Sequence, residues 1–129
     1  MSTAKTVLVV DDEAPIRMAL DRMLQEWGYR VQQAASATEA LEVMLAQPAS
    51  IILVDLIMPG HDGFWLMERI REKWPTTPIV VITGADEQDA IEKSRRDGAI
   101  DYVLKPFERE LLRQAVSRAE AALGGPPTS

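Results

Sequence analysis

Several features are scarce or missing in this chain of 129 residues. It has no cysteine, which excludes disulfides and thiolate chemistry, and only one histidine. No apolar run approaches the roughly 20 residues of a membrane-spanning helix, and the start MSTAK lacks the apolar core of a signal peptide. Lys and Arg number 14 against 20 Asp and Glu. We therefore expect a soluble, cytoplasmic domain that binds neither membrane nor, directly, nucleic acid.

Short β-branched runs alternate with longer segments of helical periodicity. The expected strands cover residues 6–10, 29–33, 50–54, 78–82 and 100–104. Strands that alternate with helices form a parallel sheet with helices on both faces, because the crossovers are right-handed. The sequence thus predicts an α/β fold of the (βα)5 type, a doubly wound five-stranded parallel sheet. The polar alternation of residues 29–33 suits an edge strand.

Helix ends and inward faces can also be read from the sequence. Gly28 stands where a glycine would end the first helix, and Ser36 with Glu39 has the spacing of a capping box that begins the second. The third and fourth helices are expected over residues 64–73 and 87–96. The apolar positions expected to face inward on the second and fifth helices are Ala40, Leu41, Met44 and Leu45, and Leu111, Leu112, Ala115, Val116 and Ala119.

The chain length suits one domain, which we expect to span residues 1–123. The closing GGPPTS, residues 124–129, has the composition of a linker. It is expected to be a tail or the start of a linker to an unseen output domain.

Acidic residues stand where two of the expected strands end. Asp11 and Asp12 follow the first strand and Asp55 follows the third. In a sheet of order 2-1-3-4-5 these strands are neighbours, and ligands bind at their carboxyl ends. Three close carboxylates raise one another's pKa or bind a cation. Mg²⁺, which needs few carboxylates, fits this set better than Ca²⁺ does.

A hydroxyl and an ammonium complete the predicted pocket. Thr83 ends the fourth strand and Lys105 ends the fifth, ahead of Pro106. Together with a metal and a carboxylate they favour phosphoryl transfer, in which charge neutralisation dominates catalysis. Asp55 would be the nucleophile and would become an aspartyl phosphate.

Four motifs at four strand ends carry a family resemblance: the Asp11-Asp12 pair, DLIMPGHDG from Asp55, ITGA around Thr83 and YVLKPF before the fifth helix. With them the chain resembles the receiver domain of two-component response regulators over residues 5 to about 122. The resemblance implies the flavodoxin-like strand order 2-1-3-4-5. It also implies a cis bond between Lys105 and Pro106.

The resemblance further implies a role for each matching residue. Asp55 would accept phosphate, and Lys105 would bind it. Asp11 and Asp12, with Asp55 and the backbone carbonyl of Ile57, would hold Mg²⁺, for which Mn²⁺ is a possible substitute. The family's switch residues would be Thr83 and Tyr102.

The partners implied are a sensor histidine kinase or a histidine phosphotransfer protein, and an output domain or downstream protein. Phosphorylation would act through the face formed by the fourth helix, fifth strand and fifth helix, by which a homodimer could also form. The chain would then be no enzyme beyond its own phosphorylation and slow dephosphorylation.

Other interpretations stay open from the sequence alone. Asp11 and Asp12 could simply cap a helix, Tyr102 could be a half-buried strand residue with a wet hydroxyl, and His61 is expected to be exposed and without chemistry. A metal-dependent phosphohydrolase also uses an aspartyl nucleophile. Such enzymes usually carry a second acid two residues later, where this chain has Ile57. A constitutive interaction module is the third class.

Overall fold

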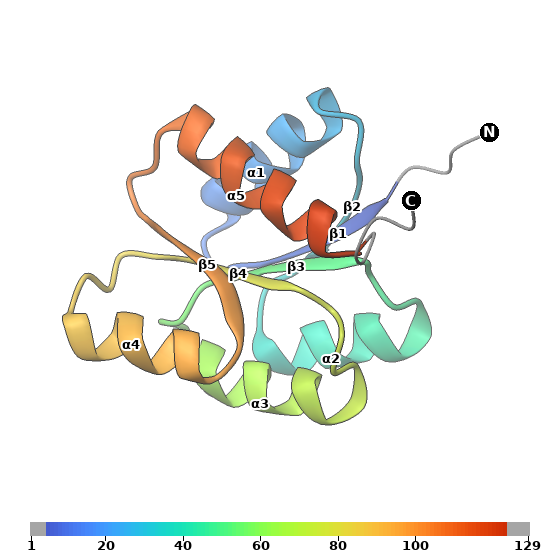
Figure 1. Ribbon diagram of the computed structural model, residues 1–129. Coiled ribbons are helices and arrows are strands. Elements are labelled where there is room, and N and C mark those ends of the chain that lie inside the picture. The colour runs from blue at the N-terminus through green and yellow to red at the C-terminus, as the bar shows by residue number, and fades with distance from the viewer. Residues whose placement is uncertain (1–4, 124–129) are drawn as a thin grey trace, which may run out of the picture.

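Five parallel strands form one sheet between two layers of helices in the computed structural model, which describes residues 5–123 (Figure 1). The elements in chain order are β1 (Thr6–Val10), α1 (Ala14–Glu26), β2 (Arg30–Ala34), α2 (Ala37–Ala46), β3 (Ile51–Val54), α3 (Gly63–Lys73), β4 (Ile79–Thr83), α4 (Gln88–Arg96), β5 (Ala99–Leu104) and α5 (Arg109–Leu123). The strand order is β2-β1-β3-β4-β5. The predicted fold and order are therefore confirmed, and the predicted tail, residues 124–129, lies outside the described residues.

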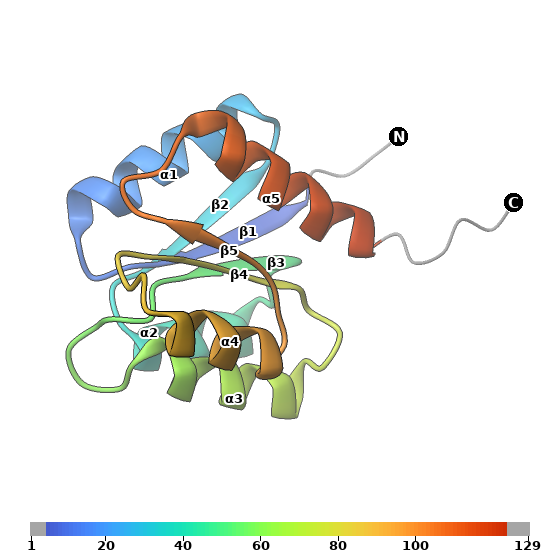
Figure 2. The same cartoon turned by 60° about the vertical axis from the view of Figure 1, so that its left-hand side comes forward.

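The helices cover the two faces of the sheet unequally. Helices α1 and α5 lie on one face, and α2, α3 and α4 lie on the other (Figures 1 and 2). Alternate residues of β1 serve the two cores, with Val7 and Val9 on the α1 and α5 side and Leu8 and Val10 on the opposite side. Because both faces are covered, β1, β3 and β4 are almost continuously apolar.

Strand register places the carboxyl ends of the strands in a row. Val10 of β1 pairs with Val54 of β3, and Val54 pairs with Val81 of β4. The residues that follow these strands consequently share one edge of the sheet. Strand β2 lies at the end of the sheet beside β1, as its polar alternation predicts.

Side chains cap two helices as the sequence indicates. Ser36 Oγ accepts a hydrogen bond from the Glu39 amide at 3.1 Å and begins α2. The Glu39 carboxylate bonds back to the amide of Ala35, also at 3.1 Å, so the predicted capping box is present with its return bond one residue earlier. Asp62 caps α3 by accepting from the Trp65 amide at 2.9 Å.

Two residues predicted to face inward are exposed instead. The exposed fraction is 59% for Leu45 on α2 and 51% for Leu111 on α5. Each directly follows or precedes a fully buried neighbour, Met44 or Leu112. Adjacent residues on a helix point about 100° apart, so Leu45 and Leu111 lie at the edge of their apolar stripes and turn away from the sheet. The prediction was wrong at these two positions because it made both apolar stripes too wide.

None of the helices within residues 5–123 is long and apolar enough to cross a membrane.

Candidate functional site

The sheet places two buried carboxylates side by side. The Asp55 amide donates to the carbonyl of Val10 at 3.0 Å, which extends the pairing of β1 with β3 by one residue. The Asp11 amide donates to the carbonyl of Ala34 on β2 at 3.1 Å. Asp11 and Asp55 are only 1% and 4% exposed. Carboxylates at such depth require a compensating charge or a proton.

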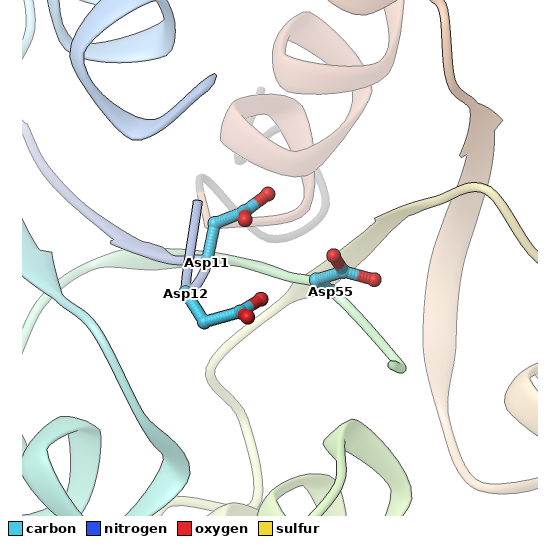
Figure 3. Close-up of side chains that lie close together, drawn as sticks. All are labelled: Asp11, Asp12 and Asp55. Carbon is cyan, nitrogen blue, oxygen red and sulfur yellow. The ribbon is translucent and has the colours of Figure 1, made fainter. Parts of the chain in front are cut away.

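Asp12 completes an all-oxygen cluster with these two residues. Asp11, Asp12 and Asp55 each offer one carboxylate oxygen, and these oxygens lie within 4.8 Å of one another (Figure 3). Asp12 is exposed, so the cluster opens to solvent on its side. Carboxylate oxygens in small number, with room for water, are the ligands that Mg²⁺ uses. The residues present therefore fit the ion that the sequence predicts.

Lys105 supplies the positive charge that the buried carboxylates need. Its Nζ donates to Asp11 Oδ2 at 2.7 Å and to Asp55 Oδ2 at 2.8 Å, and lies 3.4 Å from Glu13 Oε1. Its amide donates to the carbonyl of Thr83, and the bond to Pro106 is cis as expected. Burial, the largest single influence, would lower the pKa of Lys105, but the hydrogen bonds to Asp11 and Asp55 and the negative charge of both carboxylates together raise it.

The Asp11 carboxyl keeps a raised pKa in spite of this partner. Burial raises the pKa of its carboxyl above the ordinary value of 3.8, although hydrogen bonds from Lys105 and from the Glu13 amide oppose the shift. The Glu13 amide donates to Asp11 Oδ1 at 2.9 Å. The interpretation of Asp11 as a helix cap was wrong: the N-cap of α1 is Glu13, α1 has no side-chain cap, and the amide that Asp11 Oδ1 accepts from is that of Glu13, ahead of the helix. The other oxygen, Oδ2, accepts from Lys105.

We expect Asp11→Asn to raise the free energy of unfolding at pH 7 in metal-free buffer. An asparagine keeps the oxygen that accepts from Glu13 and removes one negative charge from a cluster with a surplus of them. Burial raises the pKa of Asp11 in the folded protein, so ionisation of Asp11 lowers the stability of the wild type. This loss of stability should be absent at a pH below 3.8, the ordinary pKa, and complete at a pH above the folded pKa. Urea unfolding from pH 3.5 to 7 measures this difference. A variant less stable than wild type at pH 7 would contradict the expectation.

Thr83 and Tyr102 meet at the loop after β4. Thr83 is fully buried, and its Oγ1 accepts from the Ala85 amide at 3.4 Å. The Tyr102 hydroxyl donates to the carbonyl of the same Ala85. The ring is half-buried on β5, as predicted, and its hydroxyl finds a backbone acceptor in the β4–α4 loop. One residue, Ala85, therefore links the Thr83 hydroxyl at the end of β4 to the Tyr102 ring on β5.

The β3–α3 loop fixes Asp55 from the other side. The Ile57 amide donates to Asp55 Oδ1 at 3.0 Å, while the Ile57 side chain is 63% exposed. Gly63 packs against the backbone of Asp55 so closely that a Cβ would lie 2.4 Å from the Asp55 carbonyl oxygen. Gly63 was not predicted to be a site residue, although a glycine in the loop after a strand-end aspartate can mark a close backbone approach.

His61 lies outside this cluster. It is exposed, as predicted, and its ring stacks on that of Trp65 with centroids 3.7 Å apart. Trp27, Trp65 and Trp74 are half-buried packing residues.

Comparison with known proteins agrees with this geometry. The family model described as "Response regulator receiver domain" matches residues 7–117. The chain is 38% identical over 120 residues to the C4-dicarboxylate transport transcriptional regulatory protein DctD of Rhizobium meliloti, covering 93% of this chain and 26% of that protein. It is 30% identical over 112 residues to the sporulation initiation phosphotransferase F of Bacillus subtilis, covering 87% and 90%.

A solved structure of the chemotaxis protein CheY4 of Vibrio cholerae superposes with a TM-score of 0.86 at 30% identity, covering 91% of this chain and 99% of that one. The chain therefore belongs to the receiver domains of response regulators, the signalling domains of two-component systems. It spans about a quarter of the length of the first curated relatives it matches.

Proposed function

We propose that the domain is a phosphorylation-dependent switch whose phosphoacceptor is Asp55. The observation that carries this proposal is a buried carboxylate, held 2.8 Å from the Lys105 ammonium, with two further carboxylates within 4.8 Å. The fold does not need this arrangement for its stability, whereas binding of phosphate and of a divalent cation would need it. Buried charge clusters are costly, and they concentrate at functional sites.

The transfer itself is a displacement at phosphorus. An oxygen of Asp55 forms the new O–P bond while the bond between phosphorus and the donor breaks, and the donor leaves with the electron pair. The donor is a phosphohistidine of a sensor kinase or phosphotransfer protein, or a small acyl phosphate. Lys105 neutralises charge on the phosphoryl oxygens, and the Thr83 hydroxyl donates a hydrogen bond to one of them. Asp11, Asp12, Asp55 and the Ile57 carbonyl would hold Mg²⁺, which supplies further neutralisation.

The signal leaves through the face formed by α4, β5 and α5. A phosphoryl group on Asp55 adds negative charge beside Thr83, and drawing that hydroxyl inward pulls on the Ala85 amide. Ala85 also holds the Tyr102 hydroxyl, so both switch residues respond together. Helix α4 buries only Ser94, which leaves it weakly anchored to the sheet. This face is the proposed site of contact with a downstream partner or a second copy.

The domain is proposed to occupy residues 1–123, with residues 124–129 as a tail or linker to an output domain. DctD is named a transcriptional regulatory protein, and the chain covers only 26% of it. By analogy an output domain or a separate target would carry the response, in the cytoplasm. Turnover of external phosphate esters is not expected, because Ile57 stands where a phosphohydrolase would carry its second acid.

The test is intact mass spectrometry after incubation with acetyl phosphate and Mg²⁺. We expect wild type to gain one phosphoryl group that is lost at alkaline pH, and Asp55→Asn to gain none. Asp62→Asn is the matched control, since Asp62 is an exposed acid of the same loop that caps α3. Equal labelling of wild type and Asp55→Asn would refute the proposal. Steady release of phosphate from simple esters would favour the phosphohydrolase.

A further inference from the structure

A series of hydrogen-bonded polar side chains on helix α1 and strand β2 leads to the backbone of the acidic cluster. The Arg17 guanidinium donates from Nη1 to the backbone carbonyl of Asp11 at 2.8 Å. Its Nε donates to Gln33 Oε1 at 2.9 Å. Gln33 in turn donates from Nε2 to Asp21 Oδ2 on α1. Arg17 is thereby held in one orientation by β2, although it belongs to α1.

The atom that Arg17 binds matters for the neighbouring residue. The Asp11 carbonyl belongs to the peptide that joins Asp11 to Asp12, so its orientation sets the direction in which the Asp12 side chain leaves the backbone. Lys105 forms ion pairs with Asp11, Glu13 and Asp55, and Asp12 is not among them. Among residues 5–123, the backbone of Asp12 is therefore what brings its exposed carboxylate within 4.8 Å of the other two.

We propose that Arg17 is a positioning residue for the divalent cation: anchored by Gln33, it fixes the Asp11–Asp12 peptide so that Asp12 faces Asp11 and Asp55. The inference rests on the proposed function, because it assumes that the three carboxylates bind Mg²⁺. Outer residues that orient metal ligands typically change metal affinity by tenfold or more when replaced. Arg17 and Gln33 would act in this way without touching the ion.

Simple electrostatics predicts the opposite sign for the same substitution. Arg17 is a cation near the cluster, so its removal would, by charge alone, strengthen the attraction of Mg²⁺. Loss of positioning would weaken binding instead. Replacement of Gln33 leaves the charge unchanged, so by charge alone it would have no effect. The direction of the two changes thus separates a positioning role from an electrostatic one.

Isothermal titration of Mg²⁺ into the full chain tests the proposal. We expect Arg17→Met to raise the Kd of Mg²⁺ roughly tenfold, and Gln33→Met to raise it in the same direction. The double variant should bind Mg²⁺ no more weakly than Arg17→Met alone, because both substitutions act through the same contact of Arg17 with the Asp11 carbonyl. The control is Arg22→Met, an exposed residue of the same helix with the same change in charge, for which the Kd should stay within about twofold.

Circular dichroism and thermal unfolding without metal show whether each variant folds, and Arg17→Ala, with Arg22→Ala as its control, replaces Arg17→Met if the latter does not. Unchanged or tighter binding by the Arg17 variant, or an unaffected Gln33→Met, would overturn the positioning role while leaving the proposed function intact. If wild type itself fails to bind Mg²⁺, the metal-dependent function fails and this inference fails with it.

Discussion

Replacing Lys105 with methionine is expected to lower the free energy of unfolding at pH 7 by about 3 to 5 kcal/mol in metal-free buffer. The lysine side chain is 13% exposed and lies within 2.8 Å of both Asp11 and Asp55. Methionine keeps much of the apolar length but leaves two adjacent buried carboxylates without a cation. Since burial already raises the pKa of Asp11 in the presence of Lys105, removal of the ammonium should increase that cost.

Millimolar Mg²⁺ should restore part of the lost stability, because it neutralises the same carboxylates and binds only the folded chain. Urea unfolding with and without Mg²⁺ measures both effects. Lys93→Met is the matched control: Lys93 pairs with Asp97 at 3.1 Å but is 48% exposed, so it should cost less than about 1 kcal/mol. If the two variants lost equal stability, or if Mg²⁺ left Lys105→Met unchanged, the electrostatic account of the pocket would be wrong.

Gly63→Ala is the second substitution with a large expected effect. The added Cβ would lie 2.4 Å from the Asp55 carbonyl oxygen and 2.7 Å from Leu56 Cα. Both are backbone atoms of the β3–α3 connection, so the clash is relieved only by moving the start of α3 or the phosphoacceptor loop. We expect a loss of about 3 kcal/mol, near the upper end for overpacking, and slower labelling of the displaced Asp55.

Gly84→Ala gives the comparison within the same chain. A Cβ at Gly84 meets nothing within 4 Å, and Gly84 is not among the glycines with positive φ. Its replacement should be neutral or stabilise the protein by up to about 1 kcal/mol. Thermal and urea unfolding of the two variants should therefore differ in sign or by several kcal/mol. Similar stabilities would show that α3 can move away from Asp55 at little cost.

The sequence was most informative where a residue's chemistry and its place in the alternation of strands and helices agreed. Asp11, Asp55, Thr83 and Lys105 each end a strand, and parallel strands end at one edge of a sheet, so their convergence was predictable. Asp12 was expected to join them because it directly follows Asp11 in the sequence. The strand order, on which this convergence depends, was expected from the family resemblance, and it is confirmed.

What could not be predicted depends on side-chain direction and on contacts between distant segments. Leu45 and Leu111 are apolar and helical, yet they lie beside the buried stripe rather than within it. No spacing rule connects Arg17 to Gln33, since the contact joins a helix to a strand that only tertiary packing brings together. The acceptor for the Tyr102 hydroxyl is a backbone carbonyl, which residue type does not reveal.

The most direct test of the central claim locates the phosphate. Borohydride reduces an acyl phosphate to an alcohol, so an aspartyl phosphate becomes homoserine while an unmodified aspartate does not. After labelling with acetyl phosphate and Mg²⁺, reduction and peptide sequencing by mass spectrometry, we predict homoserine at position 55 and at no other aspartate. Homoserine at Asp11 or Asp12, or a phosphate that resists borohydride reduction and maps to a serine or threonine, would contradict Asp55 as the phosphoacceptor.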